Sequence, residues 1–99
     1  MYTFNLKNAS ELEDMLQTRN LSLSRAVVDT IEKNINAKEK PILVANIEIE
    51  DEDISLELTV NPKEFILTLE KNLSTFEEHE EYEMCARILK NINHLKQKS

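Results

Sequence analysis

The sequence predicts an α+β protein: a small antiparallel sheet with a β-hairpin, helices on one face of that sheet, and a C-terminal antiparallel helical hairpin. Three observations predict it. The hydrophobic period is two residues over 42–60, it becomes helical after Asn61, and capping signals separate the segments. The predicted order is β-α-α-β-β-α-α. We expect a single domain over 1–99, in which 1–60 form the sheet portion and 61–98 the helical hairpin.

The chain is predicted to open with a strand and a short helix. Tyr2, Phe4 and Leu6 alternate with polar residues, which favours a strand. Asn8 and Glu11 then have the spacing of a capping box, in which the asparagine caps the helix and the glutamate reaches back. The expected inner face of this helix consists of Leu12, Met15 and Leu16.

A second helix is predicted after a polar connection. Ser24 is the expected cap, and the helical pattern continues to about Asn36 or Ala37. Pro41 cannot continue a helix, so the charged residues before it are expected to form a linker. The expected inward residues are Val27, Val28, Ile31 and Ile35.

The segment 42–60 is predicted to be a β-hairpin with an acidic loop of four residues. Two runs of alternating apolar residues flank that loop. Only one register places every apolar residue on the same side of the sheet, because a slip by one residue turns a whole strand over. The expected pairs are Ile49 with Ile54, Ile47 with Leu56, Ala45 with Leu58, and Leu43 with Val60. The opposite face would carry Asn46, Glu48, Ser55, Glu57 and Thr59.

The last third of the chain is predicted to be two antiparallel helices. Asn61 can cap the first of them, Pro62 suits its first turn, and Glu64 stands at the third helical position. The connection is short, so the two helices must be neighbours that bury their apolar stripes. The expected stripe of the first helix is Phe65, Ile66, Leu69, Leu73 and Phe76. That of the second is Tyr82, Cys85, Ala86, Leu89, Ile92 and Leu95.

The segment from Leu69 to Lys96, LEKNLSTFEEHEEYEMCARILKNINHLK, resembles the UVR motif of the excision-repair proteins UvrB and UvrC. Leu69-Glu70-Lys71 matches the opening of the family pattern, and Tyr82-Glu83-Met84-Cys85-Ala86-Arg87-Ile88 matches its middle. Ile92 and Leu95 match its end. The family motif is a helical hairpin used for protein–protein contact. The resemblance therefore implies that this hairpin docks a partner, at the end where Tyr82 lies.

The composition excludes several classes of protein. Nineteen acidic against twelve basic residues give a net charge of −7, which disfavours binding to nucleic-acid backbones and to anionic membranes. There is no glycine, so no phosphate-binding loop of a familiar kind can form. One cysteine suits a reducing, cytoplasmic location. We expect no cofactor, no signal peptide and no membrane span.

Two acidic clusters are the candidate sites. The first lies at the elbow of the helical hairpin, around His79. Its expected partner-binding residues are Phe76, Glu77, Glu80, Glu81, Tyr82 and Glu83. Phe76 and Tyr82 would be the apolar anchor and the glutamates a polar rim, whereas the alternative is a solvated elbow. The second patch is the loop Glu50, Asp51, Glu52 and Asp53. It is either a solvated hairpin tip or a patch for a basic partner, and it lacks the glycine of a calcium-binding EF-hand loop.

The sequence predicts neither a metal site nor catalysis. His79 and Cys85 are six residues apart and fall on different sides of a helix, and a second cysteine is absent. Cys85 lies on the apolar stripe and is expected to be a small core residue. His94 is far along the second helix, so no nucleophile–base set can be assembled.

The leading functional hypothesis is a small adaptor or regulator that binds another protein, one with a basic surface, through its C-terminal helical hairpin. The alternative is an acidic DNA mimic, such as a phage-encoded inhibitor of a nucleic-acid-binding enzyme. A third reading is a homodimer, because one UVR-like hairpin can pair with another. Lysine outnumbers arginine, and asparagine and isoleucine are plentiful, which suits a bacterial or phage coding sequence.

Overall fold

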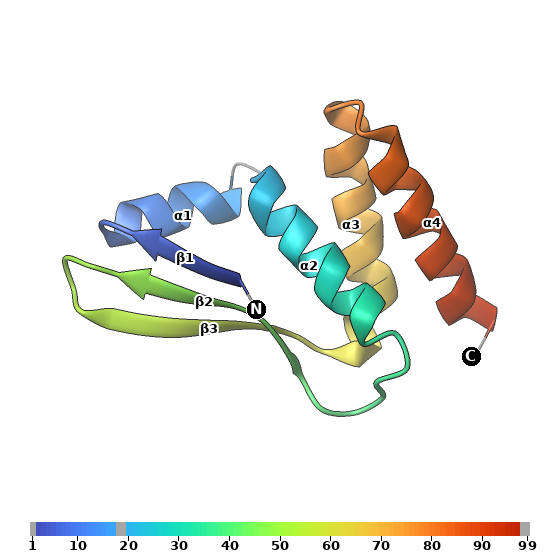
Figure 1. Ribbon diagram of the computed structural model, residues 1–99, viewed down its shortest axis with the longest axis horizontal. Coiled ribbons are helices and arrows are strands. Elements are labelled where there is room, and N and C mark those ends of the chain that lie inside the picture. The colour runs from blue at the N-terminus through green and yellow to red at the C-terminus, as the bar shows by residue number, and fades with distance from the viewer. Residues whose placement is uncertain (1, 18–19, 98–99) are drawn as a thin grey trace.

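The fold is taken from a computed structural model, which describes residues 2–17 and 20–97. The order β-α-α-β-β-α-α is confirmed. The elements are β1 (Tyr2–Leu6), α1 (Ala9–Gln17), α2 (Leu21–Lys33), β2 (Ile42–Ile49), β3 (Ile54–Val60), a 3-10 turn η1 (Pro62–Glu64), α3 (Phe65–Glu78) and α4 (Tyr82–Gln97). Figure 1 shows α1 and α2 above one face of the sheet, with α3 and α4 standing beside α2. The protein is thus an α+β fold with a C-terminal helical hairpin, as predicted.

The sheet is mixed, so the prediction of an antiparallel sheet was wrong for one strand. The strand order is β1-β2-β3, with β2 in the centre. β2 and β3 form the predicted antiparallel hairpin, whereas β1 runs parallel to β2. The reason is the connection: α1 and α2 carry the chain back along the sheet, as a helical crossover between parallel strands does.

The hairpin register is confirmed at three of the four expected pairs. Ile49 lies opposite Ile54, Ile47 opposite Leu56 and Ala45 opposite Leu58. The fourth expected pair, Leu43 with Val60, was wrong, because a register shift between Leu43 and Ala45 places Ile42 opposite Val60. Such a bulge inserts one residue into one strand. Val44 occupies the bulge and is buried, so the extra residue adds an apolar side chain to the core.

The first helix begins as predicted. The side chain of Asn8 accepts a hydrogen bond from the backbone N–H of Glu11 at 3.1 Å, which is the expected cap. The Glu11 carboxylate in turn accepts the N–H of Lys7 at 3.0 Å, one residue before the position that a capping box uses.

The second helix begins one turn earlier than predicted and ends earlier. Its cap is Asn20, whose side chain accepts the N–H of Leu23 at 3.0 Å, whereas Ser24 is buried inside the helix. The helix ends at Lys33 because Asn34 terminates it. The Asn34 side chain donates to the Thr30 carbonyl at 2.8 Å, which diverts the chain from further helical turns.

The start of the hairpin follows the predicted signal. The side chain of Asn61 accepts the N–H of Lys63 at 3.0 Å, and Pro62 lies in the first turn. That turn is a 3-10 helix, and the α-helix proper begins at Phe65. This geometry sets the direction in which α3 leaves the sheet.

The hydrophobic core has two adjoining clusters. The larger one joins α2, β2, β3, α3 and α4, and its fully buried side chains include Phe65, Phe76, Ile31, Leu69 and Ile88. The smaller one lies between α1 and the sheet, around Met15, Ile47 and Ile49. Phe4 and Leu58 pack against both clusters. The helical hairpin is therefore attached to the sheet portion through shared apolar contacts.

The buried face of α4 differs from the predicted one. Cys85 and Ile92 are buried as expected, together with Met84, Ile88 and Asn91. Tyr82, Ala86 and Leu89, which were also expected to face inward, are exposed. The helix is rotated about its axis relative to the prediction, and apolar side chains remain on its outer face.

Candidate functional site

The elbow between α3 and α4 is a tight helix-terminating turn. The N–H of Glu81 donates to the carbonyl of Phe76 at 2.9 Å, and the N–H of Glu80 donates to that of Glu77 at 3.1 Å. This pair of bonds is a Schellman motif, which satisfies the last carbonyls of a helix. Glu80 holds the position that requires positive φ, with φ of 58°. A glutamate thus stands where glycine is usual.

Tyr82 is the most exposed apolar side chain at the elbow. It opens α4 with 69% of its surface accessible. Phe76, its predicted companion in the anchor, has 0% accessible surface. A surface role for Phe76 therefore does not fit the structure, because this ring fills the core between the helices at the base of the turn. Tyr82 lacks the aromatic neighbour that the sequence suggested.

Tyr82 instead continues along the outer face of α4. Ala86 and Leu89 follow it at helical spacings of four and three residues, which place all three on one face. Ala86 is exposed, and Leu89 has 48% of its surface accessible. We call Tyr82, Ala86 and Leu89 the outer stripe. All three side chains are exposed in the described chain, so this helix face presents apolar surface to solvent.

Four glutamates of the elbow flank Tyr82 in the sequence. Glu77, Glu80 and Glu83 are exposed, whereas Glu81 is half-buried. The Glu81 carboxylate lies 2.6 Å from the guanidinium of Arg25 on α2. This ion pair joins the elbow to α2, so the predicted role of Glu81 at a partner surface competes with an internal contact.

The elbow also sets the state of the single cysteine. Burial raises the pKa of the Cys85 thiol, and the nearby Glu77 carboxylate raises it further. The thiol therefore remains protonated at neutral pH, which suits a core residue and not a nucleophile. His79 uses its Nδ1–H to donate to the Thr75 carbonyl at 2.9 Å, an ordinary helix-end contact.

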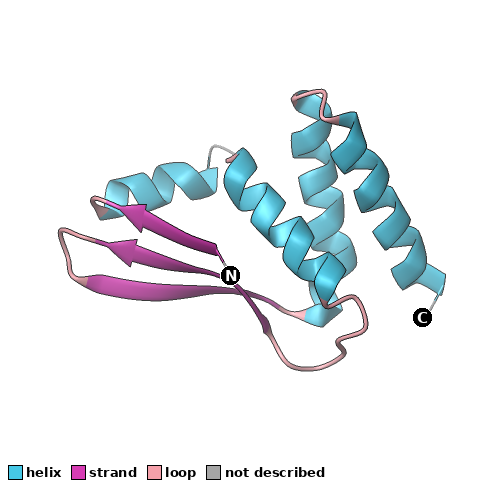
Figure 2. Cartoon of the chain, viewed as in Figure 1, coloured by secondary structure: helices cyan, strands magenta, loops and turns pink. Residues whose placement is uncertain are grey.

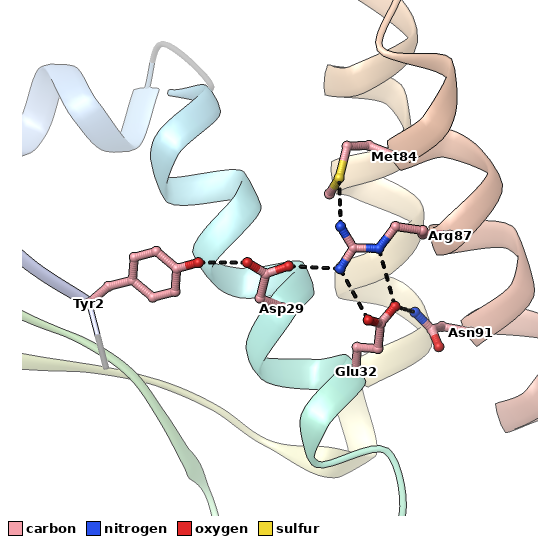
Figure 3. A network of polar contacts seen from close by, with 6 residues as sticks. All are labelled: Tyr2, Asp29, Glu32, Met84, Arg87 and Asn91. Carbon is pink, nitrogen blue, oxygen red and sulfur yellow. Dashed lines mark hydrogen bonds and ion pairs between the residues drawn. The ribbon is translucent and has the colours of Figure 1, made fainter.

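A connected cluster of polar side chains lies between α2 and α4, and Figure 3 shows it. The guanidinium of Arg87 donates to Asp29 at 2.8 Å and to Glu32 at 3.1 Å. Asn91 donates to Glu32 at 2.9 Å, and the Tyr2 hydroxyl donates to Asp29 at 2.6 Å. These five residues, which we call the arginine network, connect β1, α2 and α4.

The arginine network shifts the pKa values of its members. Partial burial opposes ionisation of Asp29, but hydrogen bonds from Tyr2 and Arg87 outweigh it and hold the pKa of Asp29 below its ordinary value. The hydrogen bond from Arg87, supported by Asn91, lowers the pKa of Glu32. The hydrogen bond to Asp29 raises the pKa of Tyr2. Every shift favours the charge state in which the hydrogen bonds and ion pairs of the network form.

The second acidic patch lies at another corner of the molecule. Glu50, Asp51, Glu52 and Asp53 are all exposed in the β2–β3 loop. Figure 2 shows this loop and the α3–α4 elbow at separate ends of the fold. The N–H groups of Glu50 and Asp51 donate to the carbonyls of Leu6 and Lys7, each at 2.9 Å, which fixes the loop beside β1. The two acidic clusters do not form one continuous surface.

A groove of about 650 Å³ opens between the α1–α2 layer, β3 and α3. Its apolar wall includes Met15, Leu16, Leu23, Val27 and Leu58, and its opposite wall carries Thr68, Lys71, Asn72 and Thr75 from α3. Over residues 2–17 and 20–97, no group of three or more potential metal-ligating side chains is found. Within the same described ranges, no helix has the length and hydropathy needed to cross a bilayer.

The sequence reasoning missed the arginine network and the Arg25–Glu81 pair. Arg87 was noted only as part of the UVR-like segment, and Arg25 was not singled out. Their signal was present in the composition, because only three of the twelve basic residues are arginines. Arginine is preferred where one side chain must bridge two carboxylates.

Comparisons of this chain with known protein families, curated proteins and solved structures found no match.

Proposed function

We propose that this protein is a non-enzymatic binding module, an adaptor or regulator that docks another protein on the elbow end of its α3–α4 hairpin. The observation that carries the proposal is the outer stripe. A tyrosine with 69% of its surface accessible begins a line of apolar residues that the fold leaves uncovered. Scattered exposed apolar residues are ordinary, but an aligned set on one helix face is typical of a contact surface.

The chemistry of the surroundings indicates what kind of partner fits. Tyrosine is enriched at the centres of interfaces because it buries a large area with few rotatable bonds. Exposed carboxylates at Glu77, Glu80 and Glu83 form a rim on the elbow side of Tyr82. A partner with an apolar pocket bordered by lysine or arginine would complement both parts. Such charges mainly accelerate association and select the partner, while the apolar centre supplies affinity.

Affinity capture from the native cell with matched variants tests the proposal. Tyr82→Ala removes the anchor, and Leu67→Ala is the control, because Leu67 is an exposed leucine on α3 outside the outer stripe. Loss of a hot-spot aromatic costs about 2 kcal/mol or more, which is roughly 30-fold in Kd. We expect the purified partner to bind wild type and Leu67→Ala equally, and Tyr82→Ala at least tenfold more weakly. Equal affinity for all three chains would remove this surface from consideration.

A second variant tests the acidic rim. Glu83→Lys reverses one exposed charge beside Tyr82. We expect slower association and a weaker dependence on salt, because fewer long-range attractions remain to be screened. A partner that associates with Glu83→Lys at the wild-type rate would show that the glutamates of the elbow are only solvated.

A further inference from the structure

We propose that β3 is a pairing edge at which a second copy of this chain adds its own β3, antiparallel, to form one continuous sheet of six strands. β3 pairs only with β2 in the described structure, and its other edge has no neighbouring strand. The backbone groups on that edge are therefore available to another strand, which is how chains add to open sheets. This contact is separate from the elbow surface and does not rest on the proposed function.

The side chains of β3 indicate that its helix-facing side is incompletely covered. Ile54 and Leu56 lie opposite Ile49 and Ile47, which have only 3% of their surface accessible. Ile54 and Leu56 each have 41% accessible, although they face the same side of the sheet. The α1–α2 layer thus covers the central strand and leaves the first half of β3 open. A neighbouring strand would cover these two side chains from the edge.

β3 carries few of the devices that usually prevent edge pairing. Proteins protect open edges with charged side chains, above all lysine, with proline, or with a bulge in the edge strand. The strand ISLELTV contains neither lysine nor proline, and the register shift of the hairpin falls on β2. Its one charge, Glu57, belongs to the opposite face of the sheet. β1, the other edge strand, has its Tyr2 side chain engaged with Asp29 of α2.

Charge selects one register for the pair of β3 strands. In an antiparallel pair about a two-fold axis at Leu56, Ile54 lies opposite Leu58 of the second copy, and Glu57 lies opposite Ser55. An axis at Glu57 would place two carboxylates face to face, which is destabilising. An axis at Ser55 would set Glu57 against Asp53. Centring on Leu56 avoids both repulsions and pairs the two exposed apolar residues with apolar partners.

The same register places no like charges opposite each other at the ends of the strands. Asp53 of one copy would lie opposite Thr59 of the other, and the uncharged end of β3 would meet the acidic loop. β3 is thus complementary to itself, and the favoured occupant of its open edge is a second copy of the chain. The net charge of −7 on each copy opposes association, so the dimer is expected to strengthen as salt rises.

Sedimentation equilibrium of the full chain, from low to high micromolar concentration and at low and high salt, tests the proposal. We expect wild type to reach twice the monomer mass and Leu56→Lys to remain a monomer with unchanged circular dichroism. Leu89→Lys and Leu67→Lys are matched controls on exposed leucines of α4 and α3, and both should still dimerise. A wild-type chain that stays monomeric, or a dimer that survives Leu56→Lys, overturns the proposal. Loss of the dimer in Leu89→Lys instead would place the contact on the outer stripe and overturn it equally.

Cysteine cross-linking tests the register without a destabilising charge. In a Cys85→Ala background, Leu56→Cys provides one thiol per chain, at the two-fold axis. Directly opposed residues of antiparallel strands lie within the range that a disulfide spans, whereas diagonal ones lie near or beyond its limit. With oxidised glutathione, we expect rapid covalent dimer from Leu56→Cys and little from Glu57→Cys in the same background. The reverse order, or equal yields, contradicts the register.

Discussion

Replacing Glu80 with glycine is expected to stabilise the protein, although the substitution removes a whole side chain. Glu80 has φ of 58° at the elbow, where its N–H donates to the Glu77 carbonyl. In this left-handed conformation the Cβ of an L-residue lies too close to the backbone, at a cost of about 1–2 kcal/mol that glycine does not incur. The Schellman motif itself needs the conformation, so the chain cannot avoid the cost by relaxing.

The expected net gain is about 0.5–1 kcal/mol. Glycine removes the steric cost, but its greater conformational freedom in the unfolded chain lowers the free energy of unfolding by about 0.4–1 kcal/mol. Loss of one carboxylate from a group that includes Glu77 and Glu83 adds a few tenths of a kcal/mol. For a domain of this size a gain of about 0.5–1 kcal/mol raises Tm by roughly 2–8 °C.

The assay is urea denaturation followed by circular dichroism, with Glu80→Ala as the matched control. Alanine removes the same charge but keeps a Cβ, so the difference between Gly and Ala isolates the backbone contribution. We expect the midpoint to rise for Glu80→Gly and to change little for Glu80→Ala, at an unchanged m-value. A Glu80→Gly chain no more stable than Glu80→Ala would show that the turn is not strained, and the reasoning would fail.

Three further predictions concern the arginine network and the core. Arg87→Ala should lower the free energy of unfolding by about 1–2 kcal/mol, a value reduced for the partial exposure of the network. Arg87→Lys should recover only part of that loss, because arginine and lysine are not interchangeable in such a contact. A double-mutant cycle of Arg87→Ala with Asp29→Asn would measure the contribution of the Arg87–Asp29 ion pair. The folded-state pKa values of Asp29 and Glu32 are lowered, so the stability that these carboxylates contribute is complete above their ordinary pKa values of about 4. That stability is lost as the pH falls through the folded-state values, and denaturant titrations at a series of pH values should show the loss. Phe76→Ala should cost about 3–5 kcal/mol in chemical denaturation, whereas Tyr82→Ala, at an exposed position, should leave stability nearly unchanged; equal losses would contradict the assignment of one ring to the core and the other to the surface.

The local structure was predictable where one physical signal dominates. The hairpin register follows from two-residue alternation, and the caps at Asn8 and Asn61 follow from side chains that can accept the first free N–H groups. The predicted bounds of the second helix were wrong at both ends. The start was wrong because two polar residues could serve as the N-cap. Asn20 and Ser24 are one turn apart, and the earlier one caps the helix because the apolar contact of Leu21 with the core already begins there.

The parts that were not predictable depend on long-range packing. Nothing in the alternation of residues 42–49 marks Val44 as a bulge, since its burial depends on the helices above it. The rotation of α4 has the same origin. Met84 and Ile88 offer a second apolar stripe beside that of Tyr82 and Leu89, and the packing of α4 against its neighbours selects between them. Phe76 and Tyr82 were each predicted both in a buried stripe and in a surface anchor, and the packing of the helices decides between the two: Phe76 is buried and Tyr82 is exposed.

The arginine network has a consequence for the order in which the molecule assembles. Arg87 meets Asp29 across 58 positions of the chain, so the bond can form only after a long loop has closed. Contacts of this kind tend to arise late, once the locally encoded hairpins have taken shape. Weakening them should therefore leave the rate of folding almost untouched and quicken unfolding instead, making this arginine a determinant of how long each native molecule persists.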